Sequence, residues 1–476
     1  MSSDLKSALK NTFNGLSVAQ MEKFERLKFT FLSIIFFFII AAYTLILNLK
    51  SSVFMGIIGK EYVPVAKLAA MIFFIPAILF YSKLVDRVKK YYLLSFYSIF
   101  YIISCLIFAF FIGHPTIGIL NTDQSPYRIF GWFFYIVSEG FSPFVLSVFW
   151  AFSNSISAPE GAKKGYGNMV SASKLGGILT AVLAWALFSF TSPLTGLGKI
   201  FNFLLVSDIA KIQIIFIISA ICLMVVPITV LLLIRKVPAS CLHGYEAVYS
   251  AEKDMREAGK ADTGIFAGLK MFLKYPYVLG IFGMIFFYEV LHTILNYLKL
   301  GVAEKAGGTI AGTSAFLFGW EIVMHSVGLL ISFFGTTALL RKLGTRACVF
   351  LIPILMGAIV LCFIFTSNST VAMVAFTLIT SLHYAFEKPV VESLYIPTLK
   401  EIKFKSKAWI DAFGRTAARS AGSIFNLLPT IFSSGGAVFS FVFAFVIGAW
   451  TITAFLMGRR FDKAIETNEA IGAESK

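Results

Sequence analysis

Charged side chains inside long apolar segments are the residues of this sequence best suited to chemistry. Glu139 lies in the apolar stretch YIVSEGFSPFVLSVFW, and Gly140 and Pro143 follow it closely. Proline removes a backbone hydrogen bond from a helix, so we expect a distorted helix beside Glu139. An ionisable group inside a membrane costs free energy and usually faces a cavity or a partner. Glu139 is therefore predicted to be functional; the alternative is a carboxyl group paired to a neighbouring hydroxyl for helix packing.

A stripe of three polar residues lies in the later apolar stretch FFYEVLHTILNYLKL. Glu289, His292 and Asn296 recur at helical spacing, which places them on one face of a helix. Such a stripe could bind a polar substrate or relay a proton, because histidine titrates near neutral pH. The alternative is a seam of hydrogen bonds between packed helices.

Two further pairs of a carboxylate and a histidine occur at helical spacing. Glu321 and His325 form one pair, and His383 and Glu387 form the other. For Glu321 a functional role and a packing role are both open. Glu387 is interpreted as a residue at the membrane interface, because Lys388 follows it directly.

Several lysines and one arginine lie at the ends of apolar segments. Lys50 ends the stretch YTLILNLK, where a lysine usually extends to the headgroups. With Lys60, Lys67 and Arg128 it could instead form a positive outer mouth. Lys174 follows SAS and enters the apolar run ILTAVLAWALF, and it either faces a cavity or extends to the headgroups.

The stretch YIPTLKEIKFKSKAWIDAFGRTAARSAGS, residues 395–423, is the richest in positive charge. Lys405 and Lys407 belong to a lysine cluster that anchoring on the cytoplasmic side explains. Arg415 and Arg419 continue into an apolar segment, which anchoring does not explain. Guanidinium groups suit planar, bidentate recognition of phosphate or carboxylate. Several cations around one cavity would therefore suit a polyanion, and the residues predict an anionic substrate.

The elements that must position these residues are membrane-spanning helices. The chain has 476 residues, of which 58% are hydrophobic and only 14% charged, unlike a soluble domain. Apolar runs of about 20 residues recur, and each can cross a bilayer as a helix. A transmembrane barrel would show short alternating strands instead. We predict an all-α membrane protein with twelve transmembrane helices, at about 29–48, 64–82, 91–112, 129–152, 168–190, 210–234, 277–298, 311–336, 347–366, 369–387, 409–431 and 436–458.

The distribution of lysine and arginine predicts the orientation. If the N-terminus is cytoplasmic, most of the 41 basic residues fall in cytoplasmic segments, which supports placing both termini inside. The net charge of +16 is therefore assigned to loops, and no nucleic-acid partner is expected. The predicted organisation is a cytoplasmic N-terminal segment (1–28), a six-helix half (29–234), a cytoplasmic linker (235–276), a second six-helix half (277–460) and a cytoplasmic tail (461–476).

Several function classes lack their motifs. The sequence has no GxxxxGK[ST] phosphate loop, no HExxH and no GxSxG, so neither a built-in nucleotide-driven motor nor an enzyme is predicted. The five cysteines are scattered without CxxC spacing, and no metal site, disulfide or cofactor is expected. The two halves carry similar basic turns, SKLVDRVKKYYLL and ALLRKLGTRACVFL. Two such halves around a long linker resemble the layout of a major-facilitator transporter.

Two stretches resemble the signatures of the nucleotide transporter family, also called the ATP:ADP antiporter family, of plastids and intracellular bacteria. FWAFSNSISAPEGAKKGYG, followed by SKLGG, is similar to its FW-x-F-x-N, E-x-A-K, Y signature, in which the asparagine is Asn154. The YIP, K-x-K-x-K-A and ID elements of residues 395–411 are similar to its second signature. The likeness implies that Lys174 enters the fifth span from the cytoplasmic side, toward the cavity.

The resemblance also implies which charged positions contact substrate. Lys50 and Glu139 match the first two positions, and the fourth falls on Lys405 or Lys407. The third is a carboxylate in the family, and here it falls on Asn296. That departure bears on substrate charge, substrate type and coupling ion.

These observations predict a secondary transporter that moves a nucleotide (ATP/ADP, another nucleoside triphosphate or NAD) by alternating access, as exchange or as proton symport. The substrate-binding set would be Lys50, Glu139, Asn154, Lys174, Glu289, His292, Asn296, Lys405, Lys407, Arg415 and Arg419. The alternatives are a proton-coupled carrier of another anionic or polar metabolite, and a membrane assembly protein without transport. The expected setting is the inner membrane of a bacterium, with the lipid bilayer as partner and the chain as a monomer.

Overall fold

A computed structural model of the 476-residue chain is helical almost throughout the part that it describes. Thr398 and Ile471 form one isolated parallel bridge there. The described residues are 22–87, 90–156, 159–189, 207–238, 241–242, 273–334, 336–366, 369–395, 398, 406, 410–431, 435–467 and 471.

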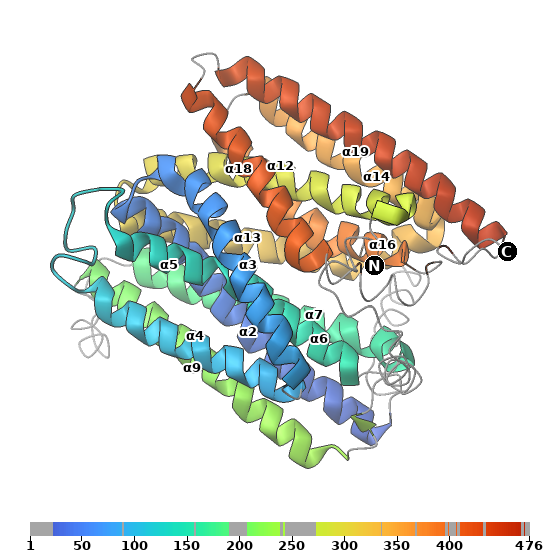
Figure 1. The fold of residues 1–476 in the computed structure, drawn as a ribbon, viewed down its shortest axis with the longest axis horizontal. Helices are drawn as coiled ribbons and strands as arrows, with labels where there is room; N and C mark the ends of the chain where they lie inside the picture. Colours follow the sequence, from blue (N-terminus) through green and yellow to red (C-terminus); the bar gives the residue numbers. More distant parts are fainter. Residues whose placement is uncertain are drawn as a thin grey trace, which may run out of the picture. The chain divides into compact units, whose positions relative to one another are not determined.

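Figure 1 shows the helices. They are, in chain order, α2 (Lys23–Ile57), η2 (Lys60–Tyr62), α3 (Val63–Arg87), α4 (Lys90–Ile112), α5 (Ile129–Glu139), η3 (Ser142–Leu146), α6 (Ser147–Ile156), α7 (Pro159–Ser189), α9 (Asp208–Lys236), α12 (Pro276–Gly307), α13 (Ile310–Phe334), α14 (Thr336–Thr366), α15 (Ser369–Leu382), η5 (His383–Glu387), α16 (Lys388–Ser393), η7 (Ile410–Gly414), α18 (Arg415–Ile431) and α19 (Gly435–Glu466). The turn η2 is a 3₁₀-helix, whereas η3, η5 and η7 are π-helical.

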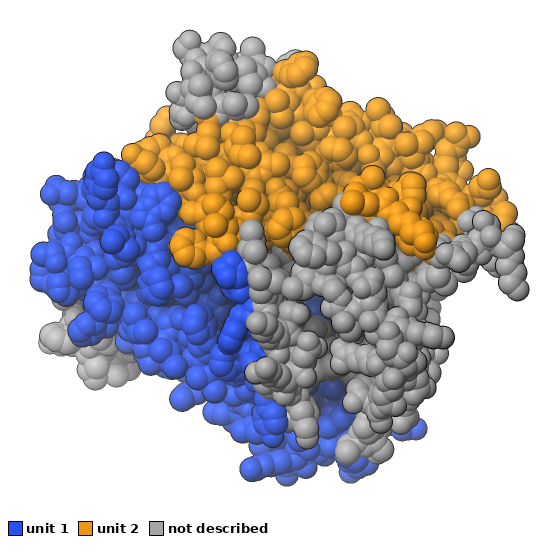
Figure 2. Space-filling view, viewed as in Figure 1, with its two compact units in different colours: residues 1–58, 76–261, 309–322 blue, residues 59–75, 262–308, 323–476 orange. Residues whose placement is uncertain are grey.

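The chain forms two compact units, which Figure 2 colours separately. Helices α3 and α13 each contribute to both. Unit 1 contains residues 1–58, 76–261 and 309–322, and unit 2 contains residues 59–75, 262–308 and 323–476. The domain boundaries drawn from the sequence, at the ends of the long linker, remain a prediction.

In unit 1, α2 packs against α5, α7 and α9, and α4 packs against α9. Aromatic rings fill much of the space between these helices. Phe108 of α4 meets the edge of Phe134 of α5 at 4.8 Å between ring centroids, and both rings contact Phe216 of α9. Edge-to-face pairs of this kind add to the burial of apolar area. The aromatic core therefore fixes α5, which carries Glu139, against its neighbours.

In unit 2, α12 packs against α15, α18 and α19, and α14 packs against α15 and α19. The core between them is apolar, with Ile281 and Leu291 of α12 and Trp450 of α19 fully buried. Helix α12 thus lies at the centre of the contacts in this unit, as α2 does in the other. Its polar residues Glu289, His292 and Asn296 are buried or half-buried among neighbouring helices.

The outer surfaces are apolar in stripes at helical spacing. On α4 the exposed residues include Phe96, Phe100, Ile103, Ile107 and Phe110. An exposed stripe of this length would be unfavourable in water and suits a hydrocarbon environment. Among the described helices, ten are long and apolar enough to span a membrane.

Helix α3 and the η7–α18 segment occupy the second and eleventh predicted spans, beyond those ten. The protein is therefore an all-α membrane protein with twelve transmembrane helices, as predicted. Several helices extend beyond the predicted spans: α14 begins at Thr336 rather than 347, α12 continues to Gly307 rather than 298, and α2 continues to Ile57 rather than 48. Polar residues near Lys50 lowered the apparent hydrophobicity there, although they are buried in the protein.

Proline explains two of the three π-helical turns. Pro143 has no N–H for the carbonyl of Glu139, and its ring would clash with that carbonyl in a regular helix. The chain widens into η3 at this point, so the distortion expected beside Glu139 is present. Pro389 stands in the same relation to Ala385, inside η5. Such π-helical turns occur frequently at functional sites.

Candidate functional site

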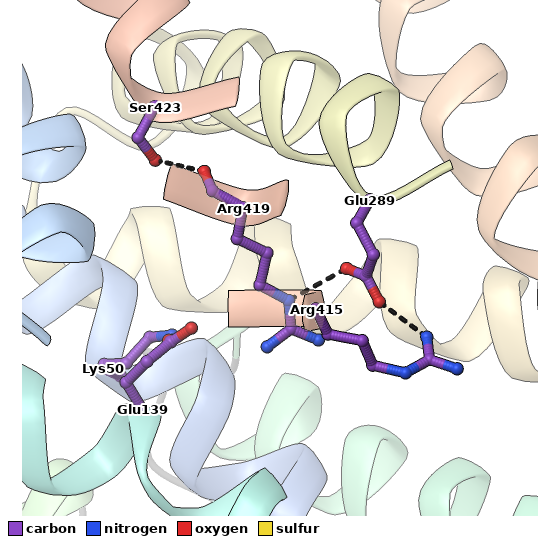
Figure 3. A network of polar contacts seen from close by, with 6 residues as sticks. All are labelled: Lys50, Glu139, Glu289, Arg415, Arg419 and Ser423. Atoms are coloured by element: carbon purple, nitrogen blue, oxygen red, sulfur yellow. Dashed lines mark hydrogen bonds and ion pairs between the residues drawn. The ribbon is translucent and has the colours of Figure 1, made fainter. Parts of the chain in front are cut away.

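Lys50 and Glu139 form an ion pair inside unit 1, shown in Figure 3. The ammonium group of Lys50 donates a hydrogen bond to the Glu139 carboxylate and also lies 4.9 Å from the ring centroid of Tyr135. The side chain of Lys50 is 5% exposed and that of Glu139 is 13% exposed. Lys50 is thus paired in the interior of the protein and does not extend to the headgroups.

The local sequence places Glu139 at the end of a regular helix, next to a distorted turn. Helix α5 ends at Glu139, and the wide turn η3 begins three residues later. Gly140 allows Tyr101 to approach, because a Cβ there would lie 2.8 Å from the phenol oxygen. Tyr101 donates a hydrogen bond to the carbonyl of Val137 at 3.1 Å, which ties α4 to this turn.

Three charged residues form a second cluster, the arginine–glutamate triad of Glu289, Arg415 and Arg419 in unit 2 (Figure 3). Nη1 of Arg415 lies 2.8 Å from Oε1 of Glu289, and Nε of Arg419 lies 2.9 Å from Oε2. Glu289 is 3% exposed at its side chain, whereas the two arginines are 20% and 30% exposed. One buried carboxylate therefore holds two partly accessible guanidinium groups.

Small residues bring the helix of the arginines close to α12. A Cβ on Gly422 would lie 2.9 Å from the carbonyl oxygen of Val290, and one on Gly414 would lie 2.6 Å from Phe282. Arg415 and Arg419 lie between these two glycines and one helical turn apart, so they share a face of α18. The close packing of α18 on α12 explains why both arginines reach the same carboxylate.

The charges of the triad leave it with a net positive charge of one. Guanidinium groups bind the oxygens of carboxylate and phosphate with the same fork geometry. A phosphate group could therefore replace the carboxylate of Glu289 on Arg415 and Arg419 without a change in the kind of contact. The arrangement fits the anionic substrate that the sequence predicted.

The other residues of the predicted stripe do not join the triad by hydrogen bonds. His292 packs its ring against Tyr288 and Phe376, at 5.5 and 5.2 Å between centroids. Asn296 is half-buried and has no polar side-chain partner within the described ranges. Glu289, His292 and Asn296 thus lie on one helix, but they have different surroundings: Glu289 binds the arginines, and His292 packs against aromatic rings.

The other residues predicted for the site are Lys174, Asn154 and two lysines before the eleventh span, and Lys60 was predicted for the outer mouth. Lys174 is half-buried in α7. Asn154 lies in α6, but its side chain is outside the described part, and so are Lys405 and Lys407. Lys60, proposed for a positive outer mouth, lies 4.9 Å from the ring centroid of Tyr297. Burial lowers the pKa of Lys60 below its usual value, and the charge of Glu304 opposes that shift.

The sequence did not reveal the surroundings of His383. Its Nδ1 lies 2.7 Å from Oε2 of Glu387, and both residues are buried. The ring of Tyr288 stacks on the imidazole at 3.5 Å between centroids, with 5° between the planes. Glu387 was interpreted as an interface residue, but only 1% of it is exposed. The histidine–glutamate spacing was the available signal, and the stacking partner on α12 was not visible in it.

Comparison with known proteins adds a family and a fold. The sequence model of a family described as "TLC ATP/ADP transporter" matches residues 6–461. No curated protein matches the chain.

Solved structures of transporters resemble it at low sequence identity. The major-facilitator proton:xylose symporter XylE, bound to 6-bromo-6-deoxy-D-glucose, has a TM-score of 0.58 and 13% identity, covering 94% of this chain and 97% of that chain. A bacterial homologue of the iron transporter ferroportin, in an inward-facing state, has a TM-score of 0.58 and 12% identity, covering 93% and 98%. Inward-open XylE from E. coli has a TM-score of 0.55 and 14% identity, covering 94% and 96%. At these identities the likeness concerns the fold.

Proposed function

The chain belongs to the TLC ATP/ADP transporter family, and we propose that it is a secondary transporter that carries nucleotides across a membrane by alternating access. The observation that carries the substrate assignment is the arginine–glutamate triad. Two guanidinium groups inside a membrane protein are costly unless they are paired. Glu289 pairs them while the site is empty, and nucleotide phosphates replace it when substrate binds.

The proposed roles follow the charges. Lys50, Arg415 and Arg419 attract phosphate oxygens, and Glu139 and Glu289 are the carboxylates that release these cations. Each carboxylate then forms its ion pair again after substrate leaves, which restores the empty state. In the Lys50–Glu139 pair and in the triad, a substrate phosphate thus replaces a carboxylate as the anion bound to the same cation.

Further residues belong to the proposed site on the family resemblance and the sequence. The two six-helix halves, residues 29–234 and 277–460, are proposed to rock about it, joined by the linker 235–276. The additional proposed substrate contacts are Asn154, Lys174, His292, Asn296, Lys405 and Lys407.

The membrane setting is proposed from the charge distribution. The excess of lysine and arginine in alternate loops supports cytoplasmic termini, with segments 1–28 and 461–476 inside. We place the protein in the inner membrane of a bacterium, as a monomer.

One observation favours a second candidate function. Asn296 stands where the family resemblance implies a carboxylate, which suits a proton-coupled carrier of another anionic or polar metabolite. Competition of unlabelled metabolites with nucleotide uptake distinguishes the two candidates.

The test is uptake of labelled ATP, ADP, GTP and NAD into liposomes that contain the purified protein. Each nucleotide is offered with and without internal nucleotide, and with and without a proton gradient. We expect saturable uptake of at least one nucleotide, lost in Arg415→Gln and Arg419→Gln. The matched control is Arg346→Gln, which removes an exposed arginine whose Nη1 lies 3.4 Å from Asp462. Folded wild-type protein that takes up no nucleotide would overturn the proposal.

A further inference from the structure

His383 and Glu387 are the two ends of the π-helical turn η5. The 2.7 Å contact between Nδ1 and Oε2 is within hydrogen-bond range, so one proton lies between the two side chains. His383 is 5% exposed and Glu387 is 1% exposed, and each would be costly to bury alone. The pair is therefore a buried proton-binding group inside a membrane helix, outside the set of residues assigned to substrate.

This pair is in direct contact with α12, the helix that carries Glu289 of the arginine–glutamate triad. The ring of Tyr288 lies parallel to the imidazole of His383 at 3.5 Å. Tyr288 immediately precedes Glu289 in α12, so a shift of this helical turn changes both the stacking on His383 and the contacts of Glu289. His292, one turn further along α12, also packs on Tyr288.

Charge connects the two sites as well. Arg415 and Glu289 both act electrostatically on His383 and on Glu387. The charged and titratable groups facing the pair are Glu289 and His292 from α12, Arg415 from α18, and Lys388 from the following helix α16; Tyr288 and Tyr384 add phenol groups.

Charge counting gives the direction of the coupling. In the empty site, the positive charges of Arg415 and Arg419 exceed the negative charge of Glu289 by one beside the pair. A nucleotide phosphate that binds both arginines adds negative charge and removes the partners of Glu289. That added negative charge favours protonation of the histidine–glutamate pair, because a proton makes the net charge of the pair more positive by one and so restores part of the charge balance.

We propose that His383 and Glu387 form the proton-binding site of this transporter, which takes up one proton when nucleotide binds to Arg415 and Arg419 and carries it across with the substrate. The proposal rests on the proposed nucleotide transport. The proton comes from water on the side that is open, binds to the pair without other bond changes, and leaves on the opposite side. Tyr288 is a positioning residue that links the pair to Glu289.

The first experiment uses the purified full-length protein in weakly buffered detergent solution with a pH-sensitive dye. ATP is added, and ATP binding is measured in parallel by calorimetry. We expect uptake of about one proton for each ATP bound by the wild type, and none for Glu387→Gln or His383→Gln. ATP binding without proton uptake by the wild type would overturn this inference and leave the nucleotide function intact. A wild type that binds none of the nucleotides would overturn the proposed function instead.

The second experiment uses liposomes and separates coupling from transport. With one proton per nucleotide, the accumulation ratio of the wild type rises about tenfold for each unit of inward pH gradient. Glu387→Gln is expected to exchange external for internal nucleotide but to show no response to the gradient. Glu321→Gln, which removes a buried carboxylate from α13, is the matched control and should respond like the wild type. A Glu387→Gln protein that retains the full gradient response would contradict the assignment.

Discussion

Replacing Glu289 by glutamine removes the carboxylate of the triad and keeps the shape of the side chain. Arg415 and Arg419 then lose their common counter-charge while the site is empty. In the proposed nucleotide-bound state the phosphates occupy both guanidinium groups, so the carboxylate is not needed there. Glu289→Gln should therefore destabilise the empty protein, bind nucleotide more tightly, and transport it more slowly because the empty state no longer re-forms its ion pairs.

The magnitude follows from the geometry. Removing one partner of a buried ion pair costs about 3–5 kcal/mol. The arginines are 20% and 30% exposed, so water compensates part of this cost, and about 2 kcal/mol is a reasonable expectation. The same free energy appears as tighter binding, since only the empty state is affected. A gain of about 2 kcal/mol corresponds to roughly 30-fold in the dissociation constant.

Thermal unfolding with and without ATP or ADP, together with calorimetry, measures both effects on one protein. We expect a lower melting temperature for empty Glu289→Gln and a larger rise on adding nucleotide than in the wild type. Asp462→Asn is the control, because it removes the carboxylate of an exposed arginine pair worth only about 0–1 kcal/mol. Weaker nucleotide binding by Glu289→Gln, together with unchanged stability of the empty protein, would contradict this prediction.

Two further predictions concern stability. Gly422→Ala should cost about 1–3 kcal/mol, because its Cβ would lie 2.9 Å from the Val290 carbonyl; Gly448→Ala, with nothing within 4 Å, should be neutral or stabilising by up to about 1 kcal/mol. Equal melting temperatures for these two variants would disprove the close approach. Arg128→Lys should cost about 1–3 kcal/mol, because the guanidinium of Arg128 donates to four carbonyls of residues 117–123. Faster limited proteolysis of that loop is the measurement, and unchanged cleavage would contradict it.

The sequence predicted the features that depend on local rules. A run of apolar residues long enough to cross a bilayer must satisfy its backbone internally, so the spans could be located from composition. The distortion beside Glu139 followed from Pro143, whose missing N–H acts only on its own helix. The likeness of the family signatures led to the family that the comparison with known proteins then confirmed.

The contacts of the site depend on how helices pack, and the sequence did not predict them. Glu289 was grouped with His292 because they share a helical face, yet its partners come from α18, about 130 residues later in the chain. Helical spacing indicates which residues are neighbours on one helix, but the rotation of the partner helix depends on close contacts between helices, such as the one that the missing Cβ of Gly422 allows. The stacking of Tyr288 on His383 was hidden for the same reason.

The cations of the Lys50–Glu139 pair and of the arginine–glutamate triad differ in exposure, and this difference predicts the order in which they meet the substrate. The side chain of Lys50 is 5% exposed, whereas those of Arg415 and Arg419 are 20% and 30% exposed. If both clusters bind substrate as proposed, we expect a phosphate to reach the partly exposed arginines before the protein changes conformation and to reach the buried Lys50 only afterwards. The arginines should therefore dominate initial binding, and Lys50 should act in the transport step.

Lys50→Gln tests this order, because it removes the buried cation and keeps most of the side chain. We expect its nucleotide dissociation constant to stay within a few-fold of the wild type while flux into liposomes is lost, since the pair with Glu139 can no longer exchange its partner. Arg419→Gln should in addition weaken nucleotide binding itself, by about 1.5–3 kcal/mol, the contribution of a hydrogen bond to a charged group. Calorimetry and uptake are measured on the same preparations. Equal losses of binding in the two variants would mean that Lys50 and the arginines meet the substrate together, which the exposures argue against.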